Sequence, residues 1–169
     1  SRILKSVAVS REDRFAELSA SEAFEIDFTI DCEDEIIGVQ RREEQFAGDV
    51  FLRDYADSRT FGRLEEVEKL RSLGFARGGS LENAVVVDGG RVLNPGGLRH
   101  ADEFVRHKML DVVGDLALAG SPIIGRYTGV KSGHDMTNRL LHRLFDEPSA
   151  WCNEIIEDRA SLCPDYEVP

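Results

Sequence analysis

Long apolar runs and excess positive charge are both missing from this chain of 169 residues. No apolar stretch approaches the roughly 20 residues that a membrane-spanning helix needs, and residues 1–7 lack the apolar core and cleavage site of a signal peptide. Acidic residues outnumber basic ones by 32 to 21, and the net charge is −11. Because nucleic-acid binders carry a basic surface, this balance argues against such a partner. We therefore expect no membrane span, no nucleic-acid partner and a cytoplasmic location.

Cysteine is also scarce, with three residues at wide spacing. Cys32, Cys152 and Cys163 form no C-x-x-C pair, and their number is odd. These features argue against a disulfide scaffold and favour a reducing compartment. We interpret the three as ordinary, partly buried thiols and assign none of them to a metal.

The composition that is present suits a soluble globular protein. Hydrophobic residues make up 41% of the sequence and charged residues 31%, which is too apolar a mixture for a disordered chain. The length fits one large domain or one domain with an insertion.

Alternation of apolar and polar residues predicts several strands. The clearest covers 24–31, where four apolar residues alternate strictly with polar ones. Residues 47–56 fit either a strand or a helix, and the chain beyond Trp151 reads as an acidic loop with a frayed end. Further strands are predicted at 3–9, 15–19, 36–40, 84–87, 91–94 and 123–130.

Helical spacing of apolar residues predicts three helices. Residues 64–73 repeat leucine and valine every three positions and precede Gly74, a natural helix end. A long helix is expected at about 102–119 and another at about 135–145. Because strands and helices are mixed and do not strictly alternate, the pattern favours an α+β fold over a parallel α/β fold.

The long helix carries the strongest chemical signal. His107, Asp111 and Asp115 are spaced i, i+4 and i+8, so they share one face. A neutral imidazole and a carboxylate one turn apart can bind the same divalent metal ion, which is the geometric logic of the H-E-x-x-H zinc motif. The pattern suggests a metal-dependent hydrolase, although two ligands do not complete a site and such pairs are common on helix surfaces.

A second polar segment, Lys131-Ser132-Gly133-His134, follows the predicted strand 123–130. Its lysine could serve a phosphate and its histidine a proton transfer, and its glycine would let the backbone approach a ligand. His134 could equally be a plain turn residue. The other two histidines, His100 and His142, have no supporting partners and are interpreted as structural or surface residues.

Four segments in this order resemble a known family. They are RTFG (59–62), GGSLENAVVV (78–87), DEFVRHKMLDVVGDL (102–116) and KSGH (131–134). The chain resembles the LpxC family of bacterial UDP-3-O-acyl-N-acetylglucosamine deacetylases, from about Ile3 to Trp151. The resemblance implies an enzyme with one Zn²⁺ that hydrolyses the N-acetyl group of a UDP-sugar bearing a hydroxyacyl chain, the committed step of lipid A biosynthesis.

The resemblance also implies roles in catalysis. His107 and Asp111 would be zinc ligands. His134 would stabilise the oxyanion or protonate the leaving amine, and Asp115 would orient His134. Thr60 would donate a hydrogen bond to the oxyanion.

Roles in substrate binding follow from the same resemblance. Phe61 would pack on the sugar ring, Lys108 would lie beside polar groups of the substrate, and Lys131 would lie near the UDP phosphates. The fold implied is a two-layer sandwich, a mainly antiparallel sheet packed on two helices. A β-α-β insertion at about 60–93 would form an apolar passage for the acyl chain, although an ordinary helix on a hairpin would show the same pattern. The passage would be lined by Leu64, Val67, Leu70, Ala76, Gly79, Ser80, Ala84 and Val85.

One feature of the family is missing from the sequence. The family's general-base glutamate precedes a third histidine ligand in the first of two similar domains, but no glutamate precedes any histidine here. We therefore interpret 1–152 as the second domain, 153–169 as an acidic tail, and the first domain as absent. With only part of the zinc site, the chain alone is expected to be nearly inactive and prone to self-association through uncovered apolar surface.

Two alternatives stay open at this point. One is a non-catalytic module that binds an acyl chain or a UDP-sugar without any metal. The other is an enzyme that is complete in this chain, with His107, Asp111 and His134 as its metal ligands. Zinc stoichiometry and a deacetylation assay would separate the three hypotheses.

Overall fold

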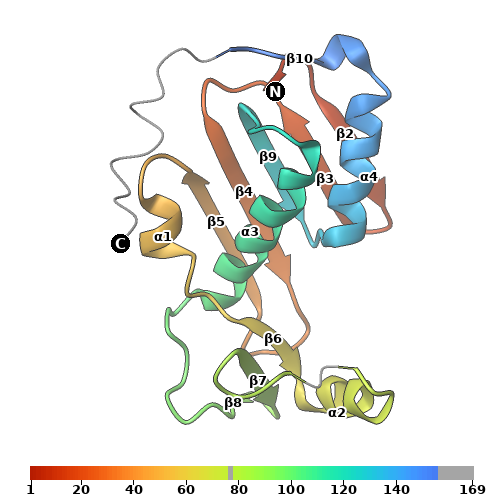
Figure 1. The fold of residues 1–169 in the computed structure, drawn as a ribbon. Coiled ribbons are helices and arrows are strands. Elements are labelled where there is room, and N and C mark those ends of the chain that lie inside the picture. Colours follow the sequence, from red (N-terminus) through yellow and green to blue (C-terminus); the bar gives the residue numbers. More distant parts are fainter. Residues whose placement is uncertain (76–77, 156–169) are drawn as a thin grey trace.

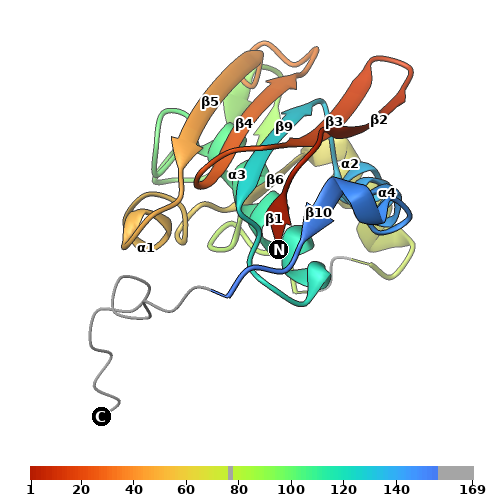
Figure 2. The same cartoon turned by 90° about the horizontal axis from the view of Figure 1, so that it is seen from above.

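The computed structural model of the protein describes residues 1–75 and 78–155. A five-stranded β-sheet forms one layer, and two long helices form a second layer against one of its faces (Figures 1 and 2). A three-stranded sheet with its own helix lies at one end of this sandwich (Figure 1). The arrangement confirms the predicted α+β fold with a small insertion.

The strands of the large sheet are β2 (Val7–Arg11), β3 (Arg14–Ser19), β4 (Phe24–Asp31), β5 (Val39–Gln45) and β9 (Gly125–Val130). Their order in the sheet is β2-β3-β9-β4-β5. Neighbouring strands are antiparallel except for β4 and β9, which run parallel. β9 comes last in sequence among the strands of this sheet, yet it lies between the two earlier hairpins, β2–β3 and β4–β5.

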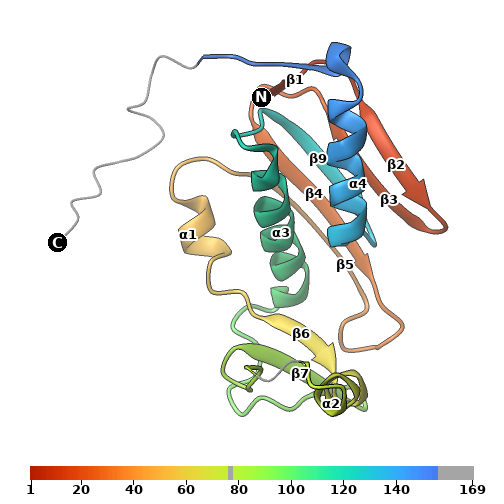
Figure 3. The same cartoon turned by 45° about the vertical axis from the view of Figure 1, so that its right-hand side comes forward.

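The core lies between this sheet and two helices, α3 (Glu103–Leu116) and α4 (His134–Phe145), which pack side by side over one face (Figure 3). Strand β4 contributes Ile26, Phe28 and Ile30, as the alternation predicts. Short 3₁₀ turns, η1 (Ala117–Ala119) and η2 (Pro148–Ala150), follow the two helices. The helices contribute Phe104, Val105, Met109, Val112, Leu116, Met136, Leu140, Leu141 and Leu144 to this core.

A glycine in β9 marks a tightly packed part of the core. The rings of Phe28 and Tyr127 stack with their centroids 6.4 Å apart. A Cβ atom at Gly129 would lie 2.8 Å from atoms of both rings. Because cores are packed as densely as organic crystals, only a residue without a side chain fits between these rings.

The predicted strand at 3–9 is wrong in its extent. The structure divides it into β1 (Arg2–Ile3) and β2, which belong to different sheets. β1 pairs with β10 (Trp151–Cys152), so the loop predicted from Trp151 onward begins as a strand. The backbone N–H groups of Leu4 and Lys5 both donate to Ala150 O. This pairing depends on a segment almost 150 positions away, which a local pattern does not reveal.

The strand predicted at 36–40 is also displaced. β5 begins at Val39 and continues through the charged residues to Gln45, while Ile37 lies in a turn and is buried. The charged side chains are compatible with a strand because β5 is at the edge of the sheet and pairs only with β4. The ambiguous segment 47–56 contains a short helix, α1 (Val50–Asp54).

The small sheet is the predicted β-α-β insertion. It comprises β6 (Thr60–Arg63), α2 (Leu64–Ser72), β7 (Ala84–Asp88) and β8 (Arg91–Val92), with β6 parallel to β7. Gly74 has a φ of +83°, and its N–H donates to Arg71 O after the end of α2. Glycine adopts this left-handed conformation without strain, so the predicted helix end is confirmed.

The face of the large sheet that bears no helix carries a network of charges around Asp27. The Asp27 carboxylate accepts hydrogen bonds from Arg41 Nε and Nη2 (2.9 and 2.8 Å) and from Arg126 Nη2 (2.9 Å). Asp27 is 7% exposed. The hydrogen bonds from Arg41, helped by Arg126, outweigh burial and hold the pKa of Asp27 below its usual value.

Replacing Asp27 by asparagine is expected to lower the free energy of unfolding by about 2 kcal/mol at pH 7, because charge-assisted hydrogen bonds are lost. The pKa of Asp27 is lowered in the folded state. Its stabilisation is therefore complete above the unfolded pKa of about 4 and is lost as the pH falls through the folded value. Urea unfolding at several pH values should show the gap between wild type and D27N closing below about pH 4. The Glu147→Gln variant, which removes a surface pair between a half-buried glutamate and Arg143, is the control. A gap that does not vary with pH would contradict the assignment.

Candidate functional site

Helix α3 presents the two predicted metal ligands on the side away from its buried residues. His107 Nε2 lies 3.6 Å from Asp111 Oδ1, and both side chains are largely buried. Two ligand atoms about 2.0–2.1 Å from one tetrahedral zinc ion would be about 3.3 Å apart. The pair therefore converges closely enough to share an ion, as the i, i+4 spacing predicts.

The environment of His107 favours the form of the side chain that binds metals. Its ring packs edge-on to Phe61, with centroids 6.1 Å apart. Burial lowers the pKa of His107 below its usual value, against the opposing pull of the Asp111 carboxylate. A lowered pKa keeps the imidazole neutral. Its Nδ1 is buried and has no hydrogen-bond partner within residues 1–75 and 78–155, which leaves a buried polar atom unsatisfied by the protein.

His134 is the first residue of α4 and faces α3. Its Nδ1 lies 2.8 and 2.9 Å from the two carboxylate oxygens of Asp115. Its Nε2 lies 4.0 Å from Asp111 Oδ2, and its side chain is 69% exposed. The structure thus brings His134 and Asp115 into the contact that was expected, while their catalytic roles stay a prediction.

Both candidate lysines are held by carboxylates. Lys108 Nζ donates to Asp111 Oδ2 at 2.6 Å. Lys131 Nζ pairs with Asp13 (2.7 Å) and with Asp31 (3.0 Å). Any phosphate that approaches Lys131 would therefore compete with these two carboxylates.

These side chains meet in a hollow of about 570 Å³, here called the polar cleft. Seven of the predicted residues line it, while Asp115 lies behind His134 in a smaller hollow with Leu118. Four lining residues were not predicted, because they come from segments that no motif marks. Asp13 and Arg14 come from the β2–β3 hairpin, and Asp31 and Cys32 from the end of β4. The polar cleft is lined by Asp13, Arg14, Ile30, Asp31, Cys32, Thr60, Phe61, His107, Lys108, Asp111, Lys131, Ser132 and His134.

A second hollow, here called the apolar passage, lies in the insertion between α2, β6 and β7. Its volume is about 780 Å³. Thr60 and Phe61 line both this passage and the polar cleft, so the two hollows share a wall. Ala76 lies outside the described residues. The other predicted lining residues all face the passage: Leu64, Val67, Leu70, Gly79, Ser80, Ala84 and Val85.

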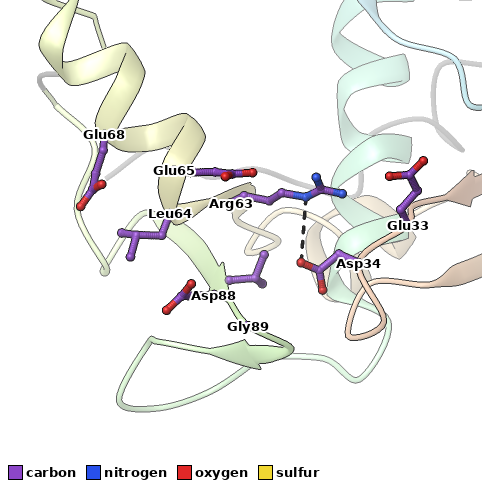
Figure 4. A pocket seen from close by; sticks show the side chains of 9 residues that line it. Glu33, Asp34, Arg63, Leu64, Glu65, Glu68, Asp88 and Gly89 are labelled. Carbon is purple, nitrogen blue, oxygen red and sulfur yellow. Dashed lines mark ion pairs between the residues drawn. The ribbon is translucent and has the colours of Figure 1, made fainter.

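A third hollow, of about 540 Å³, adjoins α2 and β7 and is strongly acidic (Figure 4). Glu65 and Glu68 belong to α2, Asp88 ends β7, and Glu33 and Asp34 precede β5. Arg63 extends toward Asp34, with Nε and Oδ2 4.0 Å apart. The carboxylates would repel an anionic ligand, so this hollow is unsuited to a diphosphate.

The polar cleft fits a metal ion only in part. It offers the neutral imidazole of His107 and the carboxylate of Asp111, which are ligand types that zinc uses. Across the two described ranges, however, no group of three or more His, Cys, Asp or Glu side chains is placed to hold a metal ion. His134 therefore does not join His107 and Asp111 in a three-ligand set. Residues 1–75 and 78–155 include no helix that is long and apolar enough to cross a membrane.

Comparison with known proteins assigns the chain to a family. Residues 1–146 match the family LpxC: UDP-3-O-acyl N-acetylglycosamine deacetylase. The chain is 50% identical to the UDP-3-O-acyl-N-acetylglucosamine deacetylase of Phenylobacterium zucineum over 88% of its length, which is 51% of that protein. It is 46% identical to the enzyme of the same name from Myxococcus xanthus, over 93% of this chain and 49% of the relative.

A third relative bearing that name, from Shewanella violacea, is 45% identical over 99% of this chain and 56% of its own length. The chain thus spans about half the length of the curated relatives it matches. With the family match over most of its residues, this chain belongs to the LpxC family of UDP-3-O-acyl-N-acetylglucosamine deacetylases.

Proposed function

We propose that this chain supplies two zinc ligands and the acyl passage of a zinc-dependent deacetylase. The substrate would be UDP-3-O-(3-hydroxyacyl)-N-acetylglucosamine, and acetate would be released in lipid A biosynthesis. One observation carries the proposal: the polar cleft that contains His107 and Asp111 shares the wall of Thr60 and Phe61 with the apolar passage. A substrate with a polar amide beside a long acyl chain needs two such adjoining surfaces.

His107 and Asp111 would hold the zinc ion in this proposal. Zinc, when bound, would polarise the amide carbonyl and activate water for the hydrolysis. The two residues lie on adjacent turns of one helix, so α3 sets their spacing without help from a loop. Lys108, which donates to Asp111 Oδ2, would orient this carboxylate. When substrate binds, the Lys108 ammonium group would contact its polar groups.

His134 and Thr60 would act on the reacting amide. Asp115 holds the Nδ1 edge of the His134 ring, which leaves Nε2 facing the cleft. That nitrogen is placed to stabilise the developing oxyanion or to give a proton to the leaving amine. The exposed Thr60 hydroxyl, on the wall of the cleft, would donate a hydrogen bond to the oxyanion.

The remaining parts of the substrate would occupy the edges of the cleft and the passage. Phe61 would pack on the sugar, and Lys131 would meet the diphosphate after release from Asp13 and Asp31. Leu64, Val67, Gly79, Ser80 and Val85 would contact the acyl chain.

The proposal assigns the third ligand and the general base to a partner domain, because a catalytic zinc ion usually has three protein ligands. Contact with that domain would also cover apolar residues that are exposed here, such as Leu118 at 70%. The same exposure fits self-association of the chain when it is alone. A cytoplasmic location, with Cys32 and Cys152 as free thiols, is part of the proposal.

Acetate release from the UDP-sugar tests the proposed function. The chain is assayed alone, and again with the half of a curated relative that it does not match. We expect turnover with Zn²⁺ only in the mixture, and loss of turnover on chelation. Binding of the UDP-sugar without any metal dependence or acetate release would favour the non-catalytic module. Full turnover by the chain alone would show instead that its own residues complete the site.

Filling the apolar passage should discriminate between acyl chains. Ala84 lines the passage, so Ala84→Phe is expected to weaken binding of a twelve-carbon fatty acid about tenfold or more, as loss of two or three buried methylenes would. A four-carbon acid should be affected much less. Isothermal titration calorimetry with both acids gives the comparison, and Leu52→Phe, on the exposed side of α1, is the control. Equal binding of the long acid to A84F and wild type would remove the passage from the proposal.

A further inference from the structure

A buried carboxylate outside the polar cleft accepts hydrogen bonds from a distant segment and from the segment just before its own helix. Glu103, the first residue of α3, has 0% exposure. Its Oε1 accepts from the backbone N–H of Arg59 (3.0 Å) and from Arg59 Nε (2.9 Å). Its Oε2 accepts from Arg59 Nη2 (3.1 Å) and from the backbone N–H of Arg99 (2.7 Å). Both oxygens are therefore fully engaged.

The donors belong to the two ends of the insertion. Arg59 directly precedes β6, where the chain enters the small sheet, and Arg99 lies between β8 and α3, where the chain returns. Arg59 Nη2 also donates to Gly97 O at 2.8 Å, which joins the entering and leaving segments to each other. One ion pair thus fastens the base of the insertion to the first turn of α3.

This attachment lies next to the wall that the two hollows share. Arg59 is followed at once by Thr60 and Phe61, and Glu103 precedes His107 by one helical turn. The Phe61 ring meets Phe104 edge-on, with centroids 5.0 Å apart, and meets His107 at 6.1 Å. Any shift of Arg59 against Glu103 would therefore move Thr60 and Phe61 relative to His107.

The energetics of buried ion pairs favour an orienting role over a stabilising one. Desolvation offsets much of the attraction, so replacing both partners by apolar residues of similar volume is often neutral for stability. The paired N–H···O bonds of a guanidinium and a carboxylate, by contrast, fix both distance and direction. We propose that Glu103 and Arg59 form a positioning pair that keeps the apolar passage aligned with His107 and Asp111, an inference whose catalytic part rests on the proposed function.

Proton NMR of the chain tests the geometry without any assay of activity. The variants are Glu103→Gln and the double variant Arg59→Met/Glu103→Met, which keeps the volume and removes both charges. We expect both to lose the nuclear Overhauser contacts from Phe61 to Phe104 and to His107. Contacts between Phe24 and Phe46, whose centroids are 5.5 Å apart in another part of the fold, should remain. If Glu103→Gln does not fold, the double variant decides, and retention of the Phe61 contacts in it would overturn the proposal.

Catalysis supplies the second readout, in the reconstituted enzyme. Misplacement of a reacting group by about 1 Å can cost about 10²-fold in rate, so we expect a fall of that order in kcat for a long-chain substrate in the double variant. Zinc content should be unchanged, because His107 and Asp111 lie on α3 itself, and Glu147→Gln serves as the control. Normal kcat with lost Phe61 contacts would overturn the alignment role. Absence of turnover in the wild type would refute the proposed function, while the NMR result would still decide whether the pair positions the insertion.

Discussion

Replacing His107 by alanine is expected to lower zinc affinity by more than the roughly 10–100-fold that loss of an outer-shell partner costs. The reason lies in the geometry of α3, where His107 Nε2 and Asp111 Oδ1 converge at 3.6 Å and no third His, Cys, Asp or Glu joins them in the described part of the chain. With one of the pair removed, a lone carboxylate already paired with Lys108 remains.

The measurement is a competition titration with Zn²⁺ and a chromophoric chelator, together with the absorption spectrum of Co²⁺ as a substitute ion. His142→Ala is the matched control, because His142 is an exposed histidine on α4. The control should bind zinc as the wild type does. Unchanged zinc binding in H107A, or an equal loss in H142A, would mean that the metal is bound somewhere other than at α3.

Replacing Gly129 by alanine is expected to lower the free energy of unfolding by about 3 kcal/mol, at the upper end of the cost of overpacking a core. The added Cβ would lie 2.8 Å from atoms of Phe28 and Tyr127. Neither ring has space to retreat, since both are buried, Tyr127 completely. The same substitution at Gly114, in α3, meets no atom within 4 Å.

Because alanine is the better helix former, Gly114→Ala should stabilise the protein by about 1 kcal/mol. Urea unfolding followed by circular dichroism gives the free energy of unfolding of both variants. Although the chemical change is the same, this free energy should fall in G129A and rise in G114A. A stable G129A protein would show that the stack of Phe28 and Tyr127 is looser than the structure has it. A similar loss in both variants would point to a general cost of removing glycine.

The sequence was a good guide wherever the decisive interactions are local. The strict alternation from Phe24 to Asp31 predicted β4, and the turn-by-turn spacing of His107, Asp111 and Asp115 predicted the shared face of α3. Gly74 predicted the end of α2 because a left-handed residue is needed at that position. In each case the residues that determine the local structure lie close together in the sequence.

Features that depend on distant segments were not predictable in this way. The division of 3–9 into β1 and β2 follows from pairing with Trp151 and Cys152. β5 can carry charged residues along its length because it is an edge strand. Its position in the sheet could not be predicted from its own residues. The polar cleft gains Arg14 from the start of β3 and Cys32 from the residue after β4. Glu103 meets Arg59 only after the insertion has folded back onto α3.

The place of β9 in the large sheet has a consequence for how the protein is made. β2–β3 and β4–β5 are hairpins of neighbouring segments, and neither needs a residue beyond 45 in order to form. They do not touch in the sheet, because β9, at residues 125–130, lies between them. Contacts between residues so far apart in sequence slow folding. The inner edges of the two hairpins, β3 and β4, therefore stay unpaired while the ribosome adds some 80 further residues. A nascent chain released before β9 would present these two open edges to other chains.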